Sequence, residues 1–287
     1  MNTYFNKDFP IYCIAIPKRK EHCIKFFNKL NFNVEYPEIV LKKDVNCSKA
    51  YSNKIIIPEY KCNKYAGKIA CSLSHIKILK TFLKTNYKYC LIFEDDNIIP
   101  NNNEVKKIHS ILNNILPKYG SWDLINLSPC WSFCSIQVKS NFDQNLYTPL
   151  TSVCRNAYAI TRKGAYEFIK IAFPLIRGSD GGDCKLKFVN NSYDLHPGLF
   201  NQDRNNMGTT IGENNYLTEC TECTFQYKFL TLSLALALFI LFKIRNNILI
   251  LKIKNNTLLF DFIIFGTILL GVLSICIQSR SYYITYD

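Results

Sequence analysis

Apolar and polar residues follow one another along the first 226 residues in the order expected of strands interleaved with helices. Short apolar runs predict buried strands at residues 11–16, 89–93, 122–127 and 157–161. Apolar residues at helical spacing predict helices at residues 23–30, 70–83 and 105–116, and Gly164 and Ala165 mark the start of another. Strands that alternate with helices indicate an α/β domain built on a mainly parallel, twisted sheet.

Two long apolar runs, residues 229–242 and 257–278, lie beyond this domain on either side of a basic patch. Only the second run reaches the roughly twenty residues that a helix needs to cross a bilayer. We therefore expect residues 227–287 to form a membrane-associated tail, in which residues 257–278 span the bilayer and residues 229–242 lie at the interface or also span. The basic patch favours the cytosolic side for itself and for residues 1–226. The alternative is that both runs are core helices of a soluble domain.

The net charge of +13 raises the question of a nucleic-acid partner. The tail holds six basic and two acidic residues beyond residue 226, so +9 remains in the body. The body lysines stand singly among Asn and Tyr, without the Arg-rich or aromatic pattern of nucleic-acid modules. We therefore expect no nucleic acid, and instead a phosphate-bearing substrate and an anionic membrane surface.

Thirteen cysteines are spread over a chain whose first residues lack the pattern of a signal peptide. This favours reduced thiols in a cytosolic setting. Cys220 and Cys223 form a CxxC pair, and Cys130 and Cys134 lie one residue further apart. A zinc site at these cysteines is the basis of a rival hypothesis, in which the protein is a membrane adaptor.

The sharpest chemical signal is a group of acids, Glu94, Asp95 and Asp96, directly after the predicted strand at residues 89–93. Ligands of open α/β sheets bind beyond the carboxyl ends of the strands. Clustered carboxylates at such a place suit a hard divalent cation such as Mn or Mg. We expect Glu94 and Asp96 to hold the metal, and Asp95 to orient a ribose or a metal-bound water. The alternative is a polar turn in which Asp95 or Asp96 caps the next element.

Other segments occur in the order found in one enzyme family. They are Gly67, Cys71, Ser74 and His75 ahead of the acids, residues 122–127 after them, the block from Ala157 to Ala165, and finally His196, Pro197, Gln202 and residues 209–211. Together these segments resemble glycosyltransferase family 25, whose founding members include lipopolysaccharide and collagen galactosyltransferases. The resemblance covers residues 10–213. It departs from the family pattern at Lys68 and Ala70, and in the loop after the first strand.

The resemblance implies a Rossmann-like nucleotide-diphospho-sugar transferase fold of the GT-A type. It also implies a metal-dependent hexosyltransferase that moves a sugar from a UDP-sugar to a hydroxyl of a glycan or protein acceptor, with inversion. Galactose and glucose are the sugars expected before others. The donor-binding residues expected on this basis are Gly67, Ser74, His75, Lys18, Arg19 and Asp95. His196 is expected to join Glu94 and Asp96 at the Mn or Mg ion, or to contact the diphosphate.

Asp180 and Asp183 lie in a glycine-rich loop where the resemblance implies an acid facing the acceptor. An inverting transfer needs a general base that takes the proton of the acceptor hydroxyl. Either acid is a candidate base, and Asp183 fits the spacing better, although it could also cap a following helix. The rival function is a catalytically inactive, membrane-tethered protein that binds a sugar or nucleotide.

Overall fold

The structure, a computed structural model, describes residues 9–57, 61–99, 105–129, 139–149, 154–175 and 189–207. All of these belong to the first of the two units into which the chain divides, Met1–Thr221 and Glu222–Asp287. The predicted tail, with its apolar runs at residues 229–242 and 257–278, lies outside the described residues. Within the described ranges, no helix combines the length and apolarity needed to cross a membrane.

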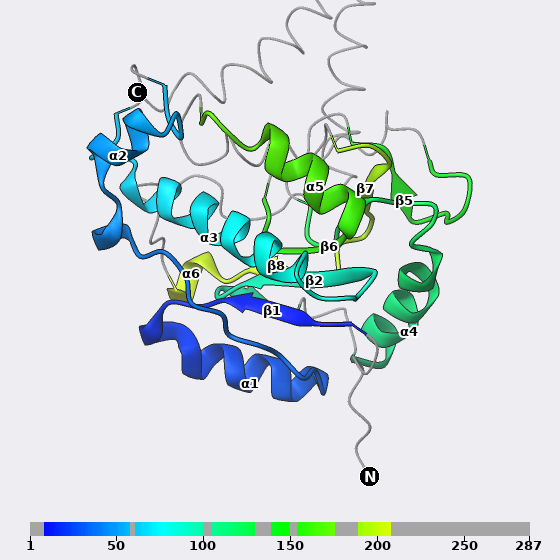
Figure 1. Ribbon diagram of the computed structural model, residues 1–287. Helices are drawn as coiled ribbons and strands as arrows, with labels where there is room; N and C mark the ends of the chain where they lie inside the picture. Colours follow the sequence, from blue (N-terminus) through cyan, green and yellow to red (C-terminus); the bar gives the residue numbers. More distant parts are fainter. Residues whose placement is uncertain are drawn as a thin grey trace, which may run out of the picture. The chain divides into compact units, whose positions relative to one another are not determined.

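The domain is a six-stranded sheet with helices on both faces (Figure 1). The strands are β1 (Ile11–Ile14), β2 (Tyr89–Glu94), β4 (Leu124–Asn126), β5 (Leu146–Tyr147), β6 (Ala157–Thr161) and β7 (Ser192–Leu195), in the spatial order β1-β2-β6-β4-β7-β5. A separate two-stranded sheet pairs β3 (Asn97–Ile98) with β8 (Asn201–Gln202). The helices are α1 (Lys20–Leu30), α2 (Cys47–Ser52), α3 (Ala66–Phe82), α4 (Val105–Ile115), α5 (Arg162–Ile171) and α6 (Arg204–Met207), with short 3-10 turns at Pro17–Arg19, Lys42–Asp44 and Leu116–Lys118.

The sheet is mixed, which corrects the expectation of a mainly parallel one. β1 pairs with β2 and β4 pairs with β7 in parallel, whereas β6 lies between β2 and β4 and runs against both. β5 at the edge is also antiparallel to its neighbour. The four predicted strand segments all form strands, and β6 has the predicted bounds. Strand direction was missed because it depends on where the connections cross, which periodicity does not report.

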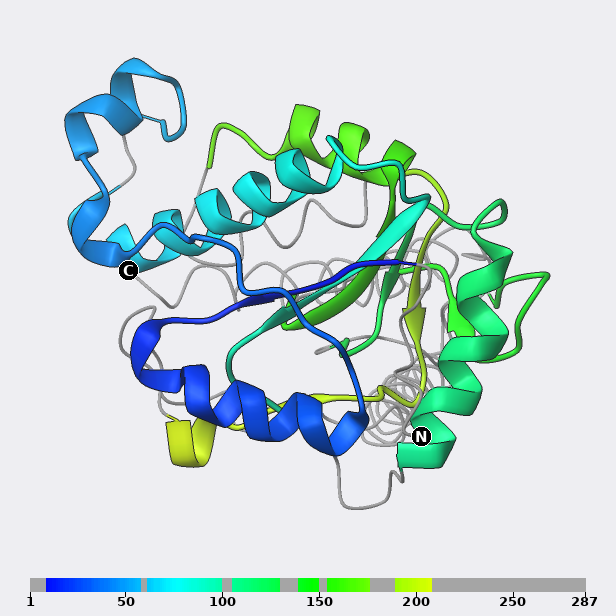
Figure 2. The ribbon, with the colours of Figure 1, turned by 60° about the horizontal axis from the view of Figure 1, so that its bottom comes forward.

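Each face of the sheet buries its own apolar cluster. Alternate residues of β2 show how the sequence achieves this, because Leu91 and Phe93 pack with α1 and α4, whereas Cys90 and Ile92 pack with α3 and α5. Figures 1 and 2 show α3 and α5 together on one face and α1 on the opposite face. A strand that is buried on both faces has a continuous apolar sequence. This is why the apolar runs at residues 11–16 and 89–93 predicted strands.

α5 begins at a close contact that requires glycine. Thr161 caps the helix by accepting a hydrogen bond from the Gly164 backbone N–H. A Cβ atom at Gly164 would collide with the backbone carbonyl of Asp123. The helix therefore starts directly after β6, as the pair Gly164 and Ala165 predicted.

Three of the cysteines that the structure describes are oxidised, which corrects the expectation of reduced thiols. Cys47 in α2 and Cys62 ahead of α3 form a disulfide, and Cys154 is also disulfide-bonded. Cys47 and Cys62 lie beside a small apolar cluster that also contains Ala50 and Ile69. A covalent link compensates for such a small core, because it restricts the unfolded chain by about 3 kcal/mol for a loop of this length. Cysteine spacing alone does not reveal the pairing.

Candidate functional site

The carboxyl ends of β1, β2, β4 and β7 meet at one edge of the sheet, because these four strands run in the same direction. The acids Glu94, Asp95 and Asp96 stand at the end of β2. Lys18 and Arg19 follow the neighbouring strand β1. The edge that the sequence predicted as a ligand site therefore carries the predicted acidic motif and, beside it, two of the predicted donor-binding residues.

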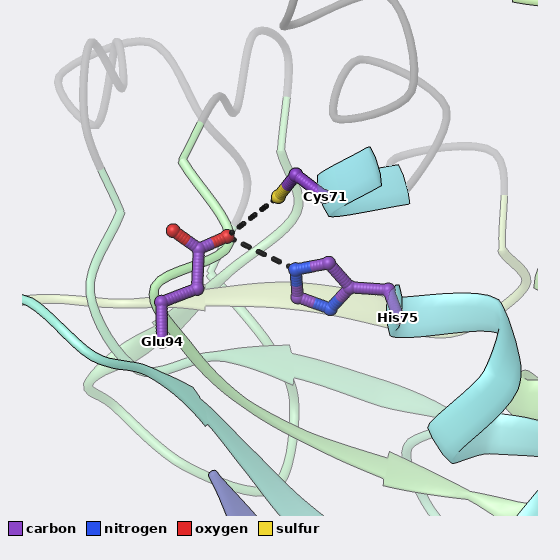
Figure 3. A group of neighbouring side chains, drawn as sticks. All are labelled: Cys71, His75 and Glu94. Carbon is purple, nitrogen blue, oxygen red and sulfur yellow. Dashed lines mark hydrogen bonds and ion pairs between the residues drawn. The ribbon is translucent and has the colours of Figure 1, made fainter. Parts of the chain in front are cut away.

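Glu94 is the last residue of β2, and its side chain faces α3 (Figure 3). It shares this face with Ile92, because side chains two residues apart along a strand point the same way. The carboxylate oxygen Oε1 lies 3.0 Å from His75 Nε2 and 3.5 Å from Cys71 Sγ. Cys71 and His75 stand one turn apart on α3, and the Glu94 side chain keeps 14% of its surface exposed. His75 and Cys71 thus bind one oxygen of this carboxylate, while the side chain stays partly exposed.

His75 is fully buried and neutral. Its pKa is lowered to about 4, first by burial and then by the nearby Arg155 guanidinium, against the opposing effect of Glu94. A neutral imidazole has one N–H. Nε2–H donates to the Glu94 carboxylate, and Nδ1, 3.0 Å from the Tyr158 hydroxyl, accepts from it. The chain Tyr158, His75, Glu94 therefore fixes both the imidazole tautomer and the position of the carboxylate.

Glu94 is ionised at neutral pH in spite of its surroundings. Burial acts to raise its pKa, but the hydrogen bond from His75, the charge of Arg155 and the hydrogen bond from Cys71 lower it. Arg155 itself is buried, with its guanidinium 5.9 Å from the ring centre of Phe168. A buried cation next to a buried carboxylate keeps the carboxylate charged at lower pH than in water.

Asp95 has contacts of a different kind, on the α1 side. Its Oδ1 lies 2.7 Å from Arg19 Nη1 in a buried ion pair, and its Oδ2 accepts the backbone N–H of Ile16 at 2.8 Å. Arg19 also donates to the backbone carbonyl of Met207 at 2.7 Å. Asp95 and Arg19, both predicted to bind the donor, are thus engaged in joining the loop after β1 to the acidic motif and to the end of α6.

Asp96 is the second residue of the turn between β2 and β3, and it is half-buried. Its backbone carbonyl accepts the N–H of Asp203 at 2.7 Å, next to the short pairing of β3 with β8. The segment around Asp203 therefore lies beside the acidic motif. Glu94 and Asp96 both lie at this edge of the sheet, and their binding of a common metal ion stays a prediction.

His196 is not brought next to these two acids. It follows β7, and two strands, β6 and β4, separate β7 from β2. Its ring stacks edge-on against Tyr147 with centroids 5.5 Å apart, and burial lowers its pKa to about 4. Three strand spacings amount to about 14 Å, so His196 and Glu94 stand too far apart for one ion to bind both in this arrangement.

Ser74, Gly67 and Lys18 show no contact with the acids among the described residues. The Ser74 hydroxyl donates to the Ala70 carbonyl and accepts the backbone N–H of Val40, which ties an extended loop to α3. Gly67 is buried in the first turn of α3, and Lys18 is exposed. Ser74 and Gly67 therefore have evident structural roles, and their donor-binding roles stay predictions. Asp180 and Asp183, the candidate bases, lie outside the described residues.

Sequence reasoning missed a buried amide network behind the acids. The Asn97 amide donates to the backbone carbonyls of Glu94 and Asn156, at 2.8 and 2.6 Å. The Asn156 amide donates in turn to Asn97 Oδ1 and to Ser128 Oγ, at 2.9 and 2.8 Å. These bonds lock the end of β2 to the residues before β6 and after β4. Tyr158 and Arg155 were also missed as site residues, although Tyr158 lies in a segment that signalled the family resemblance.

Comparisons with known proteins identify a family for the chain. A family model described as glycosyltransferase family 25 (LPS biosynthesis protein) matches residues 10–180, more than half of the chain. No curated protein matches the sequence. Among solved structures, A197 from STIV matches with 12% identity and a TM-score of 0.34, over 67% of this chain and 83% of that one. UDP-glucose phosphorylase from Trypanosoma brucei matches with 11% identity and a TM-score of 0.27, over 66% of this chain and 51% of that one.

Both structural scores are too low to carry an argument, so the family assignment depends on the sequence match. That match includes β1, α3, the three acids and the segment from β6 to α5. The chain belongs to glycosyltransferase family 25 and is a glycosyltransferase.

Proposed function

We propose that the protein transfers a hexose, galactose or glucose, from a UDP-sugar to a hydroxyl group of a glycan or protein acceptor, with inversion at the anomeric carbon. The observation that carries this proposal is the state of Glu94. It is an ionised carboxylate at the sheet edge, positioned by a neutral His75 and partly open to solvent. A carboxylate in that condition is ready to hold a cation or a donor group.

A hard divalent cation, Mn or Mg, fits the donor set. Glu94 and Asp96 supply carboxylate oxygens, which such cations prefer. No described residue forms a hydrogen bond with Glu94 Oε2, because His75 and Cys71 both approach Oε1. When bound, the cation neutralises the charge that develops on the diphosphate leaving group. Glu94 and Asp96 are the residues proposed to hold it.

The other residues of the site have separate proposed roles. His75 and Tyr158 keep the Glu94 carboxylate in place, so little reorganisation is needed when a ligand arrives. Asp183 or Asp180 is the proposed base for the acceptor hydroxyl. The predicted contacts of Gly67, Ser74, Lys18 and His196 with the donor remain part of the proposal.

Membrane attachment through residues 227–287 is a further part of the proposal, supported by the two apolar runs and the basic patch between them. Flotation with anionic lipid vesicles tests it. The full chain should float with the vesicles, and a chain ending at residue 226 should not. Equal flotation of both would contradict the assignment.

The experiment that tests the transfer is donor hydrolysis and transfer by the full chain with UDP-galactose and UDP-glucose, with and without Mn. We expect turnover that depends on Mn, and we expect Asp96→Ala to lower it about 100-fold. Asp44→Ala, at an exposed aspartate, is the matched control and should leave turnover unchanged. Full turnover by Asp96→Ala would overturn the metal assignment, and nuclear magnetic resonance of the product anomer tests inversion.

A further inference from the structure

A second kind of metal site lies on the α3 side of the acidic motif. Cys71, His75 and Glu94 each offer one ligand atom, and the three atoms lie within 4.8 Å of one another. Among the described residues, no other group of three or more His, Cys, Asp or Glu side chains comes this close together (Figure 3). The group contains sulfur, nitrogen and oxygen, which sets it apart from an all-carboxylate site.

The distances from Glu94 Oε1 to the other two ligand atoms suit tetrahedral zinc. Bond lengths of about 2.0 to 2.3 Å place neighbouring zinc ligands about 3.3 to 3.6 Å apart. His75 Nε2 and Glu94 Oε1 are 3.0 Å apart, and Cys71 Sγ and Glu94 Oε1 are 3.5 Å apart. Small side-chain adjustments therefore suffice to admit the ion, with water as the fourth ligand.

The ligands stand on rigid elements and have a supporting contact. Cys71 and His75 lie four residues apart on α3, so they share one face of the helix. Glu94 ends the buried strand β2. Tyr158 contacts His75 Nδ1 and leaves Nε2 facing the cluster. When zinc takes the Nε2 lone pair, the ring proton resides on Nδ1 and donates to the Tyr158 hydroxyl oxygen, which is the usual support of a metal-bound histidine.

The surrounding charges also suit the ion. Glu94, Asp96 and Arg155 all act electrostatically on Cys71, and together they carry one net negative charge. Zinc adds two positive charges, and the Cys71 thiol releases its proton to solvent when sulfur binds the metal. The net charge of the occupied cluster is then zero. Cys71 and Glu94 are both partly exposed, so the cluster is open to solvent on one side.

We propose that Cys71, His75 and Glu94 form a binding site for zinc or a similar thiophilic divalent cation. The sulfur and nitrogen ligands select such ions over Mn and Mg. This site differs from the one proposed at Glu94 and Asp96, and the two share Glu94. Zinc at this site therefore binds Glu94 Oε1, which otherwise accepts the hydrogen bond from His75. An occupied zinc site thus changes how Glu94 can bind the Mn or Mg ion.

Cobalt tests the proposal, because a cobalt ion bound to thiolate shows a characteristic charge-transfer absorption in the near ultraviolet. The full chain, stripped of metal with a chelator, is titrated with Co²⁺ and then with Zn²⁺. We expect an absorption that saturates at one equivalent from this site and disappears as zinc displaces cobalt. Cys71→Ser should abolish it, and Glu94→Gln should keep the thiolate absorption but weaken cobalt binding about 10-fold.

Two controls separate this site from other cysteines. Cys23→Ser alters a buried free thiol in α1 and should leave the absorption unchanged. The double variant of Cys220 and Cys223 to Ser removes the CxxC pair and should also leave it in place. Absence of the absorption in the wild-type chain, or its persistence in folded Cys71→Ser, would overturn the proposal. Binding is measured without any sugar donor, so this outcome is independent of the transfer assay.

Discussion

Glu94 and Asp95 are neighbours in sequence with opposite surroundings. Glu94 faces α3, where a neutral histidine and a thiol approach one of its oxygens and part of the side chain stays exposed. Asp95 faces α1, where an arginine and a backbone N–H engage both of its oxygens. The comparison teaches that adjacent acids can have separate roles: Asp95 joins the loops around the motif, and Glu94 is the acid that we propose to hold the metal. Four substitutions or conditions test that division.

Asp95→Ala should have the largest effect, and it should be on stability. Removing one member of a buried ion pair leaves Arg19 buried without its counter-charge, which costs about 3 to 5 kcal/mol. Urea unfolding followed by circular dichroism measures the change. Glu38→Ala, in the exposed pair with Lys77, is the control and should leave the free energy of unfolding nearly unchanged. Similar losses for the two variants would show that Asp95 is not a structural brace.

Glu94→Gln should have the next largest effect, and it should be on turnover. The amide oxygen can still accept from His75, so unfolding free energy should change by less than about 1 kcal/mol. Loss of the negative charge should lower Mn-dependent turnover about 100-fold, equal to about 2.7 kcal/mol. Glu38→Gln is the matched control. A variant that keeps its activity would remove Glu94 from the chemistry.

Acid should destabilise the fold through His75. The pKa of His75 is lowered to about 4, so the unfolded chain binds a proton near pH 6.5 that the folded chain does not bind until near pH 4. The contribution is therefore complete above pH 6.5 and is lost as the pH falls. Between pH 6.5 and about pH 5 it amounts to about 2 kcal/mol.

The measurement is urea unfolding at both pH values for the wild type and for His75→Gln, whose amide can still donate to Glu94. The variant should lose less stability on acidification than the wild type. An equal loss in both would mean that His75 is not held neutral. His196, whose pKa is also lowered to about 4, is present in both proteins and cancels in the comparison.

Tyr158→Phe should have the smallest effect of the four. The hydroxyl contacts His75 Nδ1 at 3.0 Å, and its loss leaves a buried acceptor without its donor, at a cost of about 1 kcal/mol. Tyr166→Phe, at an exposed tyrosine of α5, is the control and should be neutral. If the two variants unfold at the same urea concentration, Tyr158 does not support the histidine.

The position of the elements could be predicted from sequence more completely than their direction. Runs of apolar residues located β1, β2, β4 and β6, because strands buried on both faces leave a local signal. The antiparallel placement of β6 between β2 and β4 depends on long-range connections and left no such signal. The Cys47–Cys62 disulfide was likewise hidden, since spacing does not determine pairing.

The site was predicted in part for similar reasons. A strand that ends in three acids indicated a ligand edge, and the resemblance indicated His75. Which acid faces which helix followed only from the alternation along β2, and the neutral state of His75 followed only from burial and from Arg155. Asn97 and Asn156 gave no sign of their network, because an asparagine in sequence looks the same in a turn as in a core.

The disulfide also bears on where the domain resides. Disulfides persist in oxidising compartments and are rare in the cytosol, so the pair Cys47–Cys62 favours the oxidising side of a membrane over the cytosolic side that the basic patch predicted. Labelling with a membrane-impermeant maleimide in intact cells, before and after reduction, distinguishes the two locations.

The division between the two acids is tested most directly by Mn binding, measured by calorimetry on the folded full chain and its variants. Glu94→Gln should weaken binding of Mn at least 10-fold, whereas Asp95→Asn, whose remaining oxygen can still accept from Ile16, should bind Mn as the wild type does. Unchanged affinity in Glu94→Gln together with a loss in Asp95→Asn would contradict the account.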